Sequence, residues 1–170
     1  MTTPQDFDFD SWLDGADKPQ RSVTVYQKAG LIADLDVLAE KISNAESEDE
    51  VDGPPMGGGV GRLRAEYAKL AQQFHDSALT IRVQGLDEDE KLAIRDKTGT
   101  EGRELTYAIL SEALVSPKAT PDQVAKLKVR IGEAQFAGIL AAFHQANNAI
   151  PAVSADFLPK SSTREDGDEY

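Results

Sequence analysis

Four groups of residues in this chain have side chains and spacings that could carry chemistry. The aspartate of Asp96–Thr100 is a candidate nucleophile for phosphoryl transfer, and the glycine-rich run Met56–Gly61 could cradle a phosphate. The acids Asp87–Glu90 could hold a hard cation, and His75 and His144 could exchange protons or bind a metal. Each group also has an ordinary structural explanation.

The Asp96-Lys-Thr-Gly-Thr100 motif matches the phosphorylation sequence of P-type ATPases, in which the aspartate is the covalent nucleophile. In those proteins the motif follows a buried strand within a very large membrane protein. Here it follows a charged helical stretch, and no run of eighteen apolar residues occurs in the sequence. A short motif outside its context is a weak signal, so we interpret these residues as a helix end and a loop. A hydrolase or phosphotransferase that uses Asp96 remains a hypothesis, beside the two functions without catalysis that are described at the end of this subsection.

The other groups favour structural roles. Met56–Gly61 lacks the G-x-G-x-x-G order and follows an acidic run that would repel phosphate, so it predicts a linker. Asp87–Glu90 lacks the spacing of a calcium loop, and acids are favourable at a helix N-terminus in any case. His75 and His144 have no further ligand at a zinc-type spacing. The sequence therefore predicts no catalytic, cofactor or metal site, and the protein is not expected to be an enzyme.

The charge of the chain is strongly acidic and unevenly distributed. The formal net charge is −12, and residues 1–21, 45–52 and 151–170 carry almost all of it. Acidic segments of this kind repel nucleic acid and anionic membranes, so neither is an expected partner. Three bases in residues 126–130 are a weak nucleic-acid signal on so acidic a chain. The chain has no cysteine and no signal-peptide pattern at its start, which favours a cytoplasmic location.

The elements that would position these residues are mostly helical. Two stretches with apolar residues at helical spacing flank Gly53–Gly59, which predicts an antiparallel helical hairpin around a flexible loop. The first helix is expected to end near Ala45. Ser22–Tyr26 and Leu79–Val83 alternate as strands, and the hairpin would return the chain so that they pair. The two apolar stripes are Leu31, Leu35, Leu38 and Ile42, then Leu63, Tyr67, Leu70 and Phe74.

The second half of the chain is predicted to be helical throughout. Asp87 and Glu90 have capping-box spacing, and Thr120-Pro121-Asp122-Gln123 is a strong helix start. A further helix lies in residues 101–115, and a last one carries the apolar stripe Phe136, Ile139, Leu140 and Phe143. The fold class is therefore mainly α: a small helical domain with a minor two-stranded β element and disordered acidic ends.

Three regions follow from these patterns. Residues 1–21 form an acidic N-terminal arm, residues 22–150 a helical domain with a flexible loop at about 46–60, and residues 151–170 a polar disordered tail. The arm contains Phe7, Phe9, Trp12 and Leu13 among aspartates. Such a segment either docks on another surface or packs against its own domain.

Several stretches of the chain have a familiar order and character. An acidic start leads into Arg21–Tyr26, and Glu112–Val124 precedes an amphipathic helix that contains Glu133–Phe136, with a polar tail after it. Over about residues 5–160 the chain resembles the tail assembly chaperones of long-tailed (siphovirus-type) phages and prophages, particularly those of actinobacteria.

The resemblance implies a specific function. Such chaperones bind the tape measure protein, a long helical chain, and keep it soluble in the host cytoplasm while the tail tube polymerises; they are absent from the mature virion. Many are made in two lengths by ribosomal frameshifting, which would place a slip site near Phe157–Ser162 and imply a frameshifted longer form. The alternative is a structural minor tail or connector protein of the particle.

A chaperone for a helical client needs an accessible apolar surface. The sequence offers two stripes for partner binding, Phe136/Ile139/Leu140/Phe143 and Leu31/Leu35/Leu38, together with Trp12 of the arm. Core packing is the ordinary explanation of both stripes, and self-association is left open.

Overall fold

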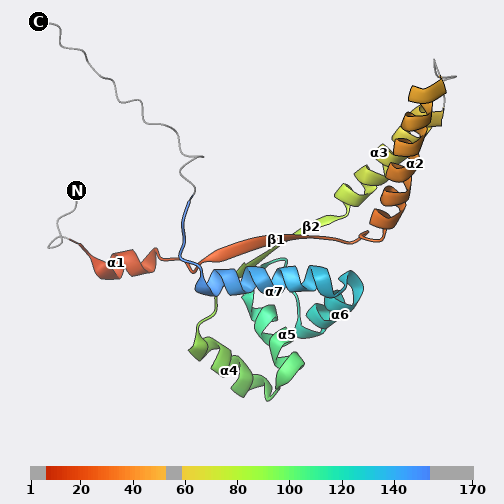
Figure 1. Ribbon diagram of the computed structural model, residues 1–170. Coiled ribbons are helices and arrows are strands. Elements are labelled where there is room, and N and C mark those ends of the chain that lie inside the picture. The colour runs from red at the N-terminus through yellow and green to blue at the C-terminus, as the bar shows by residue number, and fades with distance from the viewer. Residues whose placement is uncertain (1–6, 53–58, 154–170) are drawn as a thin grey trace, which may run out of the picture.

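The computed structural model describes residues 7–52 and 59–153, and these form seven helices and three strands. The chain is mainly α, as predicted, with a small antiparallel sheet (Figure 1). The elements in chain order are α1 Phe9–Asp14, β1 Gln20–Tyr26, α2 Leu31–Asp52, α3 Gly59–Asp76, β2 Ala78–Gln84, α4 Glu88–Thr98, α5 Gly102–Ala113, β3 Leu114–Ser116, α6 Pro121–Ile131 and α7 Glu133–Asn148.

The sheet has three strands in the order β1-β2-β3, so the prediction of two strands was wrong by one. β1 and β2 pair antiparallel along their full length, from Gln20 opposite Gln84 to Tyr26 opposite Ala78, and this pairing was predicted. β3 is short and pairs only with Arg82 and Val83, across a register irregularity. Its residues continue the apolar run of α5 without a change of period, which explains why the sequence did not reveal it.

Between β1 and β2 the chain makes the predicted helical hairpin of α2 and α3, which projects from the rest of the molecule (Figure 1). Leu35 and Leu38 are buried between the two helices, and an ion pair joins Glu46 to Arg64. α2 continues to Asp52 rather than ending near Ala45. Glutamates are good helix formers, so the acidic run extends the helix where an apolar face is no longer needed.

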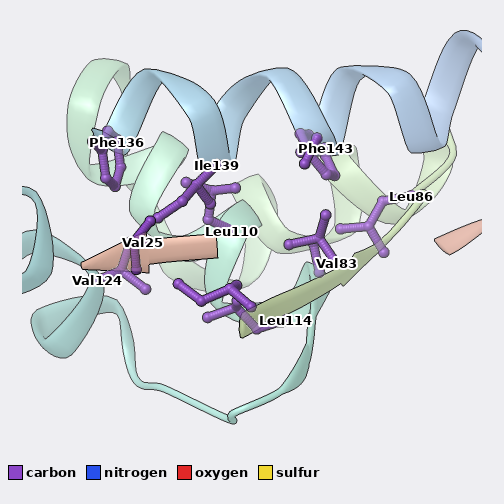
Figure 2. Close-up of a cluster of buried hydrophobic side chains, with 12 residues drawn as sticks. Val25, Val83, Leu86, Leu110, Leu114, Val124, Phe136, Ile139 and Phe143 are labelled. Carbon is purple, nitrogen blue, oxygen red and sulfur yellow. The ribbon is translucent and has the colours of Figure 1, made fainter. Parts of the chain in front are cut away.

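The main core lies where α5, α6 and α7 meet one face of the sheet. Phe136, Ile139 and Phe143 point from α7 toward the strands and α5 (Figure 2). The buried cluster consists of Val25, Ile81, Val83, Leu86, Leu110, Ala113, Leu114, Val124, Phe136, Ile139, Ala142 and Phe143.

Local sequence signals fix the ends of two helices as predicted. Asp87 and Glu90 form a reciprocal capping box at the start of α4, and Thr120 and Gln123 form another at the start of α6. α4 ends at Thr98, and the next residue, Gly99, has a φ of 64° and donates its amide to the Arg95 carbonyl. Glycine accepts this left-handed conformation without the steric cost of a Cβ. The Asp96–Thr100 motif is therefore a helix end and a loop.

Two amide side chains of α7 hold that helix across the sheet. The Gln135 Oε1 accepts the Tyr26 amide at 2.7 Å, and its Nε2 donates to the Tyr26 carbonyl at 3.1 Å. At the other end, Asn147 Oδ1 accepts the Leu86 amide at 2.8 Å. Gly85 lies so close that an added Cβ would be 2.9 Å from the Ala146 carbonyl oxygen. α7 is thus fixed at both ends of the β1–β2 pair.

The remaining expectations concern the ends and the loop. Residues 1–6 of the arm, 53–58 of the predicted loop and 154–170 of the predicted tail lie outside the described residues. The described part of the arm contains the one-and-a-half-turn helix α1, and β1 begins at Gln20, just inside the predicted arm. Within the described ranges, none of the helices is both long enough and apolar enough to cross a membrane.

Candidate protein-binding groove

An apolar groove lies between β2 and α6 on the described surface. It arises because β3 pairs only with the last part of β2, which leaves Ala78–Ile81 without a strand on that side among the described residues. α6 lies beside this stretch but cannot pair with a strand edge, so a hollow remains between the two elements. We call it the α6–β2 groove.

The groove consists of two adjoining hollows that share Leu79, Gln123 and Leu127. The inner hollow has a volume of about 230 Å³, and Phe136 and Ile139 of the core contribute to its lining. The outer hollow has a volume of about 540 Å³ and opens toward the base of the hairpin at Ser77. Leu79 is 43% exposed although it lies on the same strand face as the buried Ile81. A leucine exposed at the wall of a groove can contact a partner.

The charges around the groove are mainly positive. Lys118 borders the inner hollow, and Lys126 and Arg130 border the outer one, where Asp76 is the acidic lining residue. Lys128, on the same helix, pairs with Glu133 at 3.0 Å instead. On a chain with a net charge of −12, a basic border is a local exception. It favours a ligand that combines apolar side chains with carboxylates.

The predicted stripe on α7 is used for packing in this structure. Phe136 is 3% exposed, Ile139 and Phe143 are also buried, and Leu140 packs partly buried against the same cluster. These side chains face the sheet because Gln135 and Asn147 hold α7 across it. Leu140 and Phe143 could meet a partner directly only if α7 left the sheet, whereas Phe136 and Ile139 form part of the inner wall of the groove.

The predicted stripe on α2 is also used mainly for packing. Leu35 and Leu38 are buried within the hairpin, and Leu31 is half-buried at its base. Trp12 differs from both stripes because it is 55% exposed and α1 has no buried residue. Of the residues predicted to bind a partner, Trp12 is the one on an open surface.

The candidate chemical groups do not come together as a site. Asp96 is exposed near the end of α4, His75 is exposed near the end of α3, and His144 is exposed on α7. Among the described residues no cluster of histidines and acids could hold a metal ion, and no charged or polar side chain is buried. Asp87 and Glu90 form the α4 cap, Glu90 also pairs with Lys18, and Glu88 pairs with Lys91.

Comparison of the chain with protein families, with curated proteins and with solved structures finds no match. The groove must therefore be interpreted from its own geometry and charge.

The sequence alone did not point to the groove. Leu79 was interpreted as a strand residue, which is accurate locally, and Leu127 packs partly buried against the core. The hollow between them exists because β3 is short, which is a tertiary property. The alternation in Leu79–Val83 was a partial signal, since it placed Leu79 on the same strand face as Ile81 and Val83.

Proposed function

We propose that this protein is a non-enzymatic tail assembly chaperone of a long-tailed phage or prophage, which binds a helical segment of the tape measure protein in the α6–β2 groove. The observation that carries the proposal is the open apolar groove wall at Leu79 and Leu127. The resemblance of residues 5–160 to such chaperones supplies the identity of the client.

The groove has the properties that a helical client requires. An amphipathic helix docks by placing a few apolar side chains, spaced three and four residues apart, in a hydrophobic groove. The outer hollow is within the range of volumes that accommodate several such side chains. Lys118, Lys126 and Arg130 would pair with carboxylates beside the apolar stripe of the client, which fixes its orientation more than its affinity.

The acidic segments support the same function. A chaperone must stay soluble before its client arrives, and a high net charge suppresses self-aggregation of exposed apolar surface. Because the role ends when the tail is complete, the protein acts in the host cytoplasm and is absent from the virion. The alternative is a structural minor tail or connector protein, for which the same groove would bind a neighbouring subunit permanently.

The test is co-expression with the tape measure protein of the same phage or prophage. We expect the tape measure protein to be soluble only when this chain is present, and the two to co-purify. Leu79→Gln should weaken the complex by at least about tenfold, because it places an amide in the apolar groove wall. Leu92→Gln is the matched control, since Leu92 is 51% exposed on α4 and lies outside the groove.

Two outcomes would contradict the proposal. An equal loss of binding in the Leu79 and Leu92 variants would remove the groove from the function. Retention of this chain in purified particles, at a fixed copy number, would favour the structural alternative.

A further inference from the structure

The N-terminal arm presents an apolar face that nothing in the described chain covers. Phe9, Trp12 and Leu13 lie on one side of α1 at helical spacing, and the rings of Phe9 and Trp12 stack with centroids 5.9 Å apart. Phe7 lies beside them, with its ring centroid 6.3 Å from that of Phe9. All four side chains are about half exposed. We call residues 7–14 the aromatic arm.

The aromatic arm and the α6–β2 groove are complementary. The arm combines large apolar side chains with Asp8, Asp10 and Asp14, while the groove combines an apolar wall with a mainly basic border. We propose that the aromatic arm of one copy of this chain docks in the α6–β2 groove of a second copy, and that the exchange is reciprocal. The inference concerns the groove assigned to the client but does not require a client.

A second copy is the occupant because the arm cannot readily reach the groove of its own chain. α1 lies beyond the Gln20 end of β1, whereas α6 lies toward the other end of that strand (Figure 1). Pro19 is held in place, because its carbonyl accepts the Gly85 amide at 3.0 Å. Residues 15–19 span at most about 17 Å when extended. Leu79 is six strand residues from Gly85, or about 20 Å away. Trp12 lies about 3 Å of helical rise beyond Asp14, so it would reach Leu79 only with residues 15–19 fully extended and the direction of the arm reversed.

The buried area is sufficient for a reversible dimer. A buried aromatic side chain contributes about 150–250 Å². Since those of the arm are about half exposed already, two docked arms and the matching groove surfaces would bury roughly 1,000 Å². That value is at the lower end for specific interfaces, so the dimer should dissociate on dilution. Reciprocal exchange gives a closed two-fold dimer, whereas one-way docking would leave a free arm and a free groove and would form chains.

The experiment uses the one tryptophan of the chain as its probe. The full-length protein is diluted over a wide concentration range, and Trp12 emission and sedimentation velocity are followed together. We expect the emission to be blue-shifted at high concentration and to shift to the red on dilution, while the sedimenting mass falls from two chains to one. Salt should move both transitions to higher protein concentration, because the border charges are exposed and screened.

Variants test the two sides of the contact. Phe9→Ala should reduce the association constant by at least about tenfold, and Val129→Ala, an exposed residue outside the groove, should leave it unchanged. Lys126→Glu with Arg130→Glu should also dissociate the dimer. Adding Asp10→Lys and Asp14→Lys to that variant should restore association, which a merely unfolded protein could not do.

Three results would overturn the inference. The wild-type chain could stay monomeric while the Trp12 emission is blue-shifted at every concentration, which would mean that the arm docks within one chain. It could also stay monomeric with red-shifted Trp12 emission throughout, or it could dimerise to the same extent with and without Phe9→Ala. None of these results would bear on client binding, which the co-expression experiment measures separately. Conversely, loss of client solubilisation with the dimer intact would leave this inference standing.

Discussion

The body of the molecule and its projecting hairpin are both built from apolar helical stripes, but they bury them to very different degrees. The body packs α5, α6 and α7 on a sheet, and its cluster includes side chains that are almost completely inaccessible. In the hairpin, Leu35 and Leu38 of α2 are the buried hydrophobic residues, and α3 contributes none among its described positions. Two helices alone cannot enclose a core. Apolar helical stripes therefore give a cooperatively folded unit in the body, whereas in the hairpin they stabilise only the contact between α2 and α3.

The largest expected effect is in the body. Phe136→Ala should lower the free energy of unfolding by about 3–5 kcal/mol, because it removes a ring from a closed core. Chemical denaturation followed by circular dichroism measures this change. Val129→Ala is the control, because this side chain is 82% exposed and lies outside the core cluster, and the expected change is within about 0.5 kcal/mol. A loss of under about 1 kcal/mol for Phe136→Ala would mean that α7 is not held on the sheet, and its stripe would again be available to a partner.

A smaller and more local effect is expected in the hairpin. Leu38→Ala should cost about 2 kcal/mol, at the low end for a buried leucine, since the two helices can close partly around the space. Hydrogen exchange should show faster exchange in α2 and α3 with little change in α5 and α7. Val37→Ala, at the exposed neighbouring position, serves as the control. Equal acceleration in both regions would show that hairpin and body unfold as one unit.

The connection between the two regions is the next test. Gln135→Ala removes both side-chain hydrogen bonds to Tyr26, where β1 leads into the hairpin, and should cost about 1–2 kcal/mol. Exchange of the Tyr26 amide should accelerate markedly. Gln145→Ala, at an exposed position of the same helix, should change neither quantity. If the two variants behave alike, the amide bridge is not what fixes α7 to β1.

The smallest effect is a gain. Gly61 lies inside α3, and an added Cβ would meet no atom within 4 Å, so Gly61→Ala should stabilise the hairpin by about 0.5–1 kcal/mol. Slower hydrogen exchange in α3 would measure it. Gly85→Ala is the opposite case in the body, because its Cβ would be 2.9 Å from a backbone oxygen, and it should destabilise the protein. A stabilised Gly85 variant would contradict the close approach of α7 to the end of β2.

Much of the fold could be predicted from the sequence because its signals are local. The capping residues Asp87, Glu90, Thr120 and Gln123 act on backbone groups within one turn, so their spacing suffices to place two helix starts. The hairpin and the β1–β2 pair followed from periodicity and from the return of the chain. β3 was missed because Leu114–Ser116 continues an apolar run, and only its position beside Val83 makes it a strand.

The candidate site was much less predictable. An apolar stripe has the same sequence whether another element covers it or not, so Phe136 in the core and Leu79 in the groove wall could not be distinguished beforehand. Trp12 could be singled out because aspartates surround it, and a core element seldom has that composition. The groove itself depends on how far β3 extends along β2, which no local pattern encodes.

The hairpin is an excursion between two strands that are already in register where it begins and ends. Tyr26 lies opposite Ala78, and the Gln27 amide donates to the Ser77 carbonyl, so the sheet closes before the helices start. Removing the same number of helical turns from α2 and α3 would therefore shorten the projection without altering strand pairing. Evolution or design can therefore change the length of the hairpin without rebuilding the domain that carries it.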